Sequence, residues 1–209
     1  MGAFKLIARN GELFRDFEKY AIVHKDYVLV KIKYALLTDI DYLALTLKKH
    51  TVLGTLALGK IVEKGIEVSK NVLGKTVVLG PKCLSKIYVR DIEGLASSYV
   101  AVPVNCVKET SLNNPYILLA PCFKELLRYG NLKYVLEGGD NVWGFNPTPL
   151  SEGGIKTYVC CLDFYEKLNV DEKFLSEVEK HLKTYFFKIE EKLAELKKAL
   201  MKSIVFVIF

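Results

Sequence analysis

A glycine-bearing segment in the second half of the chain has residue types and spacing that could hold a nucleotide. Gly139, Asn141 and Gly144 follow an apolar run and occupy the three glycine positions of the pattern G-x-G-x-x-G. In that pattern, backbone N–H groups at a helix N-terminus bind a pyrophosphate. Asp163 ends the next predicted strand, at about the distance expected of an acid that binds a ribose hydroxyl. These four residues are the candidate cofactor site, although a turn is the commoner role for an aspartate that ends a strand.

Three departures weaken this candidate site. Asn141 replaces the second glycine, whose missing side chain lets the backbone approach the pyrophosphate. Asp140 places a negative charge beside an anionic ligand. Pro147 and Pro149 lie where the first helix of such a unit would run, and interior prolines break helices. We therefore expect no cofactor, with NAD(P) binding as the alternative.

The cysteines and histidines do not form a metal-binding pattern. The three histidines are far apart in the sequence, and no two cysteines have C-x-x-C spacing. An odd number of irregularly spaced cysteines argues against both a disulfide framework and a structural zinc site. We therefore expect neither a structural zinc site nor a disulfide framework from Cys83, Cys106, Cys122, Cys160 and Cys161.

The sequence of residues 1–110 predicts mostly β-strands. Short runs of alternating or β-branched residues are separated by glycine and proline. The predicted strands are Tyr27–Tyr34, Lys60–Glu63, Lys75–Leu79 and Ser98–Pro103. Several short strands with turns between them indicate a barrel-like β domain.

The pattern becomes mixed beyond residue 111. A helix is predicted over Tyr116–Tyr129, and buried strands are predicted at Leu132–Leu136 and Thr157–Leu162. Apolar residues recur at three- and four-residue steps from Asp171 to Lys202, which predicts one long amphipathic helix. The apolar run Ser203–Phe209 is too short to cross a membrane, and we expect it to be a buried strand.

Three segments carry a family resemblance. Gly54 to Gly65 resembles the stretch that medium-chain dehydrogenases write as G-H-E-x-x-G-x-V-x-x-x-G, with its glycines in register. Lys31–Asp41 looks like the strand leading into the C-G-[ST]-D motif of that family. Gly94–Pro103 looks like its G-x-[FL]-A-x-Y-V-x-V-P, with one additional residue. The chain thus resembles the medium-chain dehydrogenase/reductase family over about residues 25–165. The members that it resembles are the zinc alcohol dehydrogenases.

The resemblance implies that the zinc ligands of the family are replaced here. The cysteine ligand falls at Thr38 and the histidine ligand at Thr55, while Leu56 stands at the glutamate position. Asp41 keeps the position of an acid that orients the histidine ligand in zinc members. A threonine hydroxyl does not replace a thiolate or imidazole on Zn²⁺. Thr38, Asp41 and Thr55 are therefore candidate catalytic residues only if they line a small polar pocket. The favoured alternative is that they are buried, hydrogen-bonded residues of the core.

The resemblance also implies a fold, in the α+β or α/β class. A GroES-like β-barrel domain is expected over residues 1–125. A shortened Rossmann-like α/β remnant is expected over residues 126–209, with a long C-terminal helix over 171–202 and a final strand. Family members are markedly longer than this chain, so the resemblance is to a truncated and degenerate relative.

The amino-acid composition indicates the class of the protein, its source and the partners that it is expected to lack. A hydrophobic content of 51% and a charged content of 26% describe an ordinary globular protein. The absence of glutamine and the excess of lysine over arginine match a thermophile. The net charge of +6 lies in residues 1–110, where lysines alternate with apolar residues as on the outer faces of strands. We therefore expect no binding of nucleic acid or membrane, and a cytoplasmic location.

Two functions from different classes remain. The first is a non-catalytic binding or scaffold protein, a pseudoenzyme, built on a dehydrogenase fold without zinc. The second is a zinc-independent NAD(P)-dependent oxidoreductase of the quinone-reductase type. A homodimer through the C-terminal helix or the terminal strand is a secondary expectation. The degenerate glycine pattern favours the first function, and no small-molecule ligand is identified.

Overall fold

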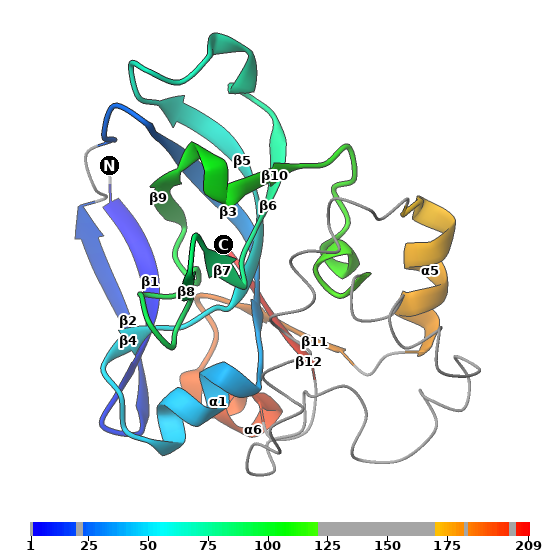
Figure 1. Ribbon diagram of the computed structural model, residues 1–209. Coiled ribbons are helices and arrows are strands. Elements are labelled where there is room, and N and C mark those ends of the chain that lie inside the picture. Colours follow the sequence, from blue (N-terminus) through cyan, green and yellow to red (C-terminus); the bar gives the residue numbers. More distant parts are fainter. Residues whose placement is uncertain (1, 20–22, 121–169, 182–183, 201–203) are drawn as a thin grey trace.

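The computed structural model describes residues 2–19, 23–120, 170–181, 184–200 and 204–209 (Figure 1). Strands dominate and helices are few, so the predicted α+β class is confirmed. The strands are β1 (Gly2–Arg9), β2 (Glu12–Lys19), β3 (Tyr27–Leu37), β4 (Thr51–Val52), β5 (Leu56–Lys64), β6 (Thr76–Leu79), β7 (Lys82–Cys83), β8 (Lys86–Ile87), β9 (Tyr99–Pro103), β10 (Val107–Glu109), β11 (Thr184–Lys188) and β12 (Ile204–Ile208). The helices are α1 (Asp39–Thr46), α5 (Glu172–His181) and α6 (Leu193–Leu200), with 3-10 turns η1 (Lys70–Val72), η2 (Val104–Cys106) and η3 (Pro115–Leu118).

The strands form two main sheets. A 3-stranded sheet has the order β2-β1-β4, and its β1–β2 hairpin turns at Asn10 and Gly11, both at positive φ. A 7-stranded sheet has the order β10-β6-β5-β3-β12-β11, with β9 also paired to β3. All four strands predicted in residues 1–110 are present, as β3, β5, β6 and β9, and the predicted starts of β6 and β9 are each one residue early. Within the described residues, these pairings do not close into a barrel.

An irregularity in β3 gives the large sheet a core on each face. Ile32 pairs with Gly59 and Tyr34 pairs with Leu58, so Lys33 is an extra residue in the ladder. One extra residue moves the following side chains to the other face of a sheet. Accordingly Val28, Val30 and Ile32 lie in the main core, whereas Leu36 lies in a second apolar cluster with Leu58 and Phe206.

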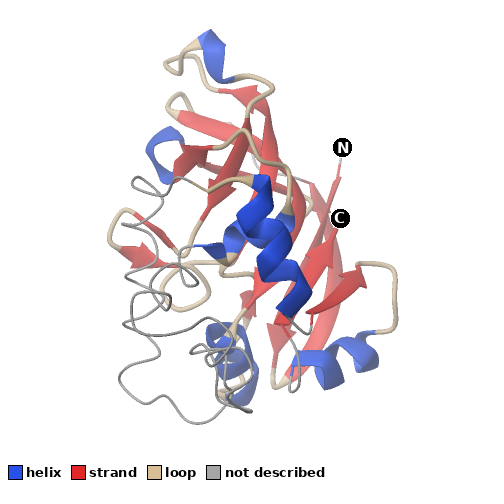
Figure 2. Cartoon of the chain, turned by 90° about the vertical axis from the view of Figure 1, so that its right-hand side faces the viewer, coloured by secondary structure: helices blue, strands red, loops and turns tan. Residues whose placement is uncertain are grey.

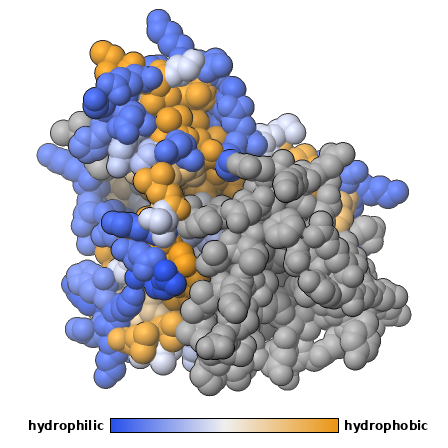
Figure 3. Space-filling view, viewed as in Figure 1, coloured by the Kyte–Doolittle hydropathy of each residue, from blue (hydrophilic) through white to orange (hydrophobic). Residues whose placement is uncertain are grey.

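The second cluster is covered by η3 and α5. Tyr116 and Leu118 of η3 and Leu175 of α5 are buried in it. Figure 1 shows η3 between the large sheet and α5, and Figure 2 shows α5 in front of the strands. On the face seen in Figure 3, hydrophobic residues gather along the middle of the described strands, between hydrophilic ones. The amphipathic segments of the chain therefore cover the face of the sheet that the β3 irregularity makes apolar.

The prediction of one helix over Asp171–Lys202 is wrong. The segment forms α5, then β11, then α6. β11 is a run of threonine and aromatic residues, Thr184-Tyr185-Phe186-Phe187-Lys188, and such residues favour strands. Its parallel pairing with β12 and the full burial of Phe187 outweigh the helical spacing of the apolar residues.

The final run forms a buried strand, as predicted. β12 lies between β3, to which it is antiparallel, and β11, to which it is parallel, and α6 is the crossover between the two parallel strands. Both edges of β12 are occupied within the chain, and the homodimer through the C-terminal helix or this strand stays a prediction. The end of the chain is therefore continuous with the sheet formed by residues 27–109. The expected division between residues 125 and 126 falls outside the described residues and stays a prediction.

One disulfide bond contradicts the cysteine analysis. Cys83 of β7 and Cys106 of η2 are joined, with their Cα atoms 5.0 Å apart. The spacing of the cysteines could not reveal this pair, because the fold of the β6–β10 region brings together residues 23 positions apart. Cys122, Cys160 and Cys161 lie outside the described residues. No helix in the described ranges is long and apolar enough to cross a membrane.

Candidate functional site

The candidate residues Thr38, Asp41 and Thr55 come together where β3 ends and α1 begins. Thr38 is the N-cap of α1, and its side-chain oxygen accepts from the backbone N–H of Ile40 at 3.3 Å. Asp41, three residues later, accepts from the backbone N–H of Thr38 at 2.7 Å. This reciprocal arrangement is a capping box, which satisfies backbone donors at a helix start. The local sequence T-D-I-D therefore forms the first side of the site.

Thr55 supplies the second side from the residue before β5. Its hydroxyl donates to Asp41 Oδ2 at 2.8 Å, and its Oγ1 lies 2.8 Å from Thr38 Oγ1. The Thr38 hydroxyl also donates to Asp41 Oδ2, at 3.3 Å, so both hydroxyls contact one carboxylate oxygen. The positions at which the resemblance places two zinc ligands are therefore adjacent in space, as two ligands of one ion would be.

Gly54 closes the network from the backbone. Its N–H donates to Asp41 Oδ1 at 2.5 Å, and its carbonyl accepts from Leu95 N–H at 2.7 Å. Its φ is +93°, and a Cβ at this position would lie 2.4 Å from the backbone nitrogen of Ala96. Only glycine fits both this conformation and this close approach. Asp41 is thus held by groups from residues 38 and 54–55 at once.

The network is buried. Asp41 and Thr55 have no exposed surface, and Thr38 is 4% exposed. Burial raises the pKa of Asp41 to about 6, while hydrogen bonds from the backbone of Thr38 and Gly54 and from both threonine hydroxyls act in the opposite direction. A carboxyl group with such a pKa changes its charge near neutral pH, but here it has no contact with solvent.

The donor chemistry does not fit a zinc ion. Two neutral hydroxyls and one carboxylate face one another, and each polar atom already has a partner within the network. Zinc in proteins takes thiolate, imidazole and carboxylate ligands. Within the described ranges, no group of three or more His, Cys, Asp or Glu side chains could hold a metal ion. The arrangement can join α1 to the 53–55 segment, but it leaves no free group for acid–base chemistry.

The candidate cofactor residues Gly139, Asn141, Gly144 and Asp163 lie outside the described residues, so the nucleotide site stays a prediction. The resemblance to the medium-chain dehydrogenases also implies a third metal ligand, at Ala120, and this residue is fully buried in the second apolar cluster.

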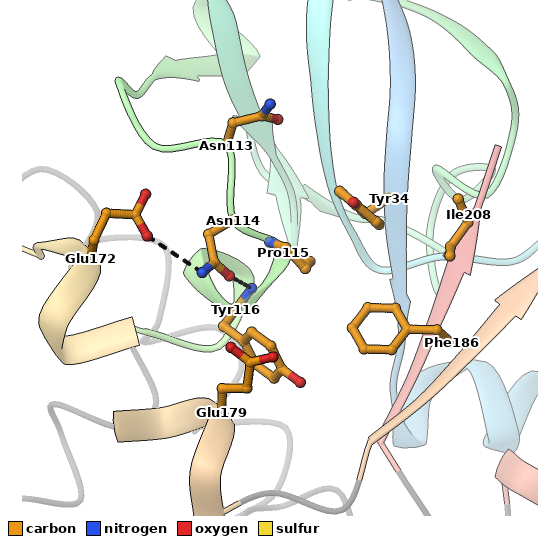
Figure 4. A pocket seen from close by; sticks show the side chains of 9 residues that line it. All are labelled: Tyr34, Asn113, Asn114, Pro115, Tyr116, Glu172, Glu179, Phe186 and Ile208. Atoms are coloured by element: carbon orange, nitrogen blue, oxygen red, sulfur yellow. Dashed lines mark hydrogen bonds between the residues drawn. The ribbon is translucent and has the colours of Figure 1, made fainter. Parts of the chain in front are cut away.

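Sequence reasoning missed a cleft on the other side of the large sheet. It has a volume of about 420 Å³ and lies between β3, η3, α5, β11 and β12 (Figure 4). Tyr34, Tyr116 and Phe186 line it, together with Glu172 and Glu179. Each of these residues has an ordinary strand or helix pattern in the sequence, so no local signal could have found the cleft.

Comparisons with known proteins identify the fold. The sequence matches no family model and no curated protein. Among solved structures, the chain is similar to a thermostable alcohol dehydrogenase from Pyrobaculum aerophilum, with a TM-score of 0.55 and 12% identity over 99% of this chain and 100% of that chain. It is also similar to TarJ of S. aureus, with a TM-score of 0.60 and 11% identity over 100% of this chain and 99% of that one.

A third similar structure contains a nucleotide. It is a candidate zinc-binding dehydrogenase from Sinorhizobium meliloti 1021 bound to NADP, with a TM-score of 0.51 and 15% identity over 63% of this chain. The chain spans 46% of that protein, and similarly less than half of two further dehydrogenase structures. At these identities the similarity establishes the fold, which is that of the medium-chain dehydrogenases, as the motifs of residues 31–103 predicted.

Proposed function

We propose that this chain, which has a medium-chain dehydrogenase fold, is a zinc-free pseudoenzyme that acts by binding rather than by catalysis. One observation supports the proposal above all. Where the resemblance places the cysteine and histidine ligands, Thr38 and Thr55 hydrogen-bond to each other and to buried Asp41. The polar groups at this position hold the protein together and have no capacity left for a substrate.

Zinc-dependent alcohol oxidation requires a Lewis acid that lowers the pKa of the bound alcohol. The side chains at the site offer no thiolate and no imidazole for such an ion. Asp41 cannot act as a general base from its present place, because a base must come within hydrogen-bond distance of the proton that it takes. Thr38, Gly54 and Thr55 surround this carboxylate and separate it from any substrate.

Metal analysis of the purified protein tests the proposal. We expect well under one zinc per chain after dialysis, and no oxidation of simple alcohols with NAD⁺ or NADP⁺, with or without added Zn²⁺. A T38C/T55H variant is the matched comparison, since it returns a thiolate and an imidazole to the two adjacent positions. Stoichiometric, tightly held zinc in the unmodified protein would overturn the proposal.

The second candidate function is a zinc-independent NAD(P)-dependent oxidoreductase. The NADP bound to a structure of the same fold favours it. Titration with NADPH and with NADH decides between the two functions, because a ligand at 100 times its dissociation constant stabilises a protein by roughly 2.7 kcal/mol. We expect no change in melting temperature with either nucleotide. A clear rise that a G139A variant abolishes would favour the oxidoreductase.

A further inference from the structure

The cleft behind the large sheet has walls from segments far apart in the sequence. Tyr34 and Ile208 come from β3 and β12, Phe186 from β11, Tyr116 from η3, and Glu179 from α5. Figure 4 shows Glu172 and Glu179 on the helix side and Phe186 and Ile208 on the strand side. A volume of about 420 Å³ is in the range of small-molecule sites. The cleft lies on the opposite face of the sheet from the main core.

Aromatic rings form walls rather than a flat platform. One face of the Phe186 ring stacks on Phe206, with centroids 5.2 Å apart and an interplanar angle of 14°. The rings of Tyr34 and Tyr116 stand at 71° and 81° to that of Phe186, with centroids 6.4 and 6.2 Å from it. Tyr34 and Phe186 are half-buried, so these two rings form the accessible aromatic walls, while the buried Tyr116 ring packs behind them.

The rings are held in place by the fold. Tyr116 is 3% exposed, and its hydroxyl bonds to Thr184 Oγ1 at 2.9 Å. Its backbone N–H donates to the side chain of Asn114 at 3.0 Å, and Asn114 in turn donates to Glu172 at 3.5 Å. This chain of contacts fixes η3 against α5, so the aromatic walls are formed before any ligand binds. A preformed site loses less entropy when it binds.

The charge of the lining is negative. Glu172 and Glu179 are the charged residues among those that line the cleft. Glu172 accepts from Asn114, whereas Glu179 has no ion-pair partner within the described part of the chain. Lys33 lies at the rim, where its ammonium group is 5.2 Å from the Tyr34 ring and 3.4 Å from Asn113 Oδ1. The Tyr34 ring thus already has one cation–π contact, with a cation of the protein itself.

We propose that this cleft binds an alkylated ammonium ion, with the cation against the rings of Phe186 and Tyr34 and the charge balanced by Glu179. Aromatic walls with a nearby carboxylate are the chemistry that recognises quaternary ammonium groups, because the faces of the rings carry partial negative charge. The inference is independent of the zinc question, since the cleft shares no residue with the Thr38–Asp41–Thr55 network. It adds a ligand class to the proposed binding function.

Titration of the full chain with choline, followed by NMR or calorimetry, tests the proposal. The matched ligand is the uncharged isostere of choline, dimethylbutanol, in which carbon replaces the nitrogen. We expect saturable binding of choline and roughly tenfold weaker binding of the isostere, because only choline gains the cation–π and carboxylate interactions. A peptide bearing trimethyllysine distinguishes the sources: tighter binding than choline assigns the cation to a protein side chain, and weaker binding assigns it to a free small molecule.

Two substitutions test whether choline binds in the cleft. E179Q keeps the shape of the side chain and removes its charge, so we expect it to weaken choline binding roughly threefold to tenfold. The matched control is E195Q, which removes an exposed charge from α6 outside the cleft and should leave binding unchanged. Equal binding of choline and its isostere, no binding of any of the three probes, or equal effects of E179Q and E195Q would overturn the proposal.

Discussion

Asp41 is a carboxylate enclosed by hydrogen-bond donors, and its buried position makes stability depend on pH. The pKa of Asp41 is raised to about 6 in the folded protein, against about 3.9 in an unfolded chain. The folded state therefore holds this proton more tightly than the unfolded state does. The resulting stabilisation is fully present below about pH 4 and is lost as the pH rises through 6.

We predict that the difference in unfolding free energy between the wild type and D41N falls by about 2 kcal/mol from pH 4 to pH 7. Asparagine does not titrate, so the comparison cancels the contribution of every other group. Urea unfolding at several pH values within this window provides the measurement. A difference that stays constant with pH would show that the pKa of Asp41 is close to that of an exposed aspartate.

Tyr88 carries a buried hydroxyl with no hydrogen-bond partner among the described residues. The side chain is 3% exposed, and burial, with a smaller contribution from Tyr27, raises the pKa of Tyr88. Removing an unsatisfied hydroxyl breaks no hydrogen bond. We predict that Y88F leaves the unfolding free energy unchanged or raises it by about 1 kcal/mol.

The matched control for Tyr88 is Y116F. That substitution removes a hydroxyl bonded to Thr184 Oγ1, so it should cost about 1 kcal/mol. Denaturant unfolding of the two variants under one set of conditions makes the comparison. If Y88F proved the more destabilising of the two, the Tyr88 hydroxyl would have a partner.

At the scale of elements, β12 ties the last segment of the chain into the large sheet. It joins β3 to β11, and Phe206 at its centre is fully buried against Phe186 and Tyr116. We predict that F206A costs about 3–5 kcal/mol, because it leaves a cavity between the sheet, η3 and α5. The control is I66A, at a position that is 89% exposed, which should change stability by less than about 0.5 kcal/mol.

Thermal and urea unfolding measure both of these changes. Amide hydrogen exchange shows which strands are destabilised. Loss of packing at β12 should lower the protection of amides in β11 and in the second half of β3. A cost for F206A no larger than that of I66A would mean that β12 does not hold the sheet together.

At the scale of the whole molecule, a covalent link ties the β7–β8 region to the segment between β9 and β10. The Cys83–Cys106 bond closes a loop of 23 residues, for which the chain-entropy model gives a stabilisation of about 3 kcal/mol. We predict that a reducing agent lowers the unfolding free energy by roughly this amount. The C83S/C106S variant should show the lower stability with and without reductant.

Equal stability of the wild type in oxidising and reducing buffer would contradict this prediction. Such a bond is also uncommon in mesophilic cytosolic proteins, whereas intracellular proteins of hyperthermophiles often contain disulfides. The disulfide therefore agrees with the thermophile composition of the chain, and both the source and the cytoplasmic location stay predictions.

The local sequence determined the strands of residues 27–103, the buried final strand and the motifs whose resemblance places Thr38 and Thr55 at two zinc-ligand positions. Each of these follows from side-chain alternation, from capping residues or from a motif, which are properties of neighbouring residues. Only the tertiary structure decided that residues 184–188 form a strand, that Cys83 pairs with Cys106, and that Asp41 is enclosed by Gly54 and Thr55. The physical reason is that strand pairing, cross-links and buried hydrogen bonds join residues that are distant in the chain. Their free energy outweighs the local conformational preferences on which prediction from the sequence depends.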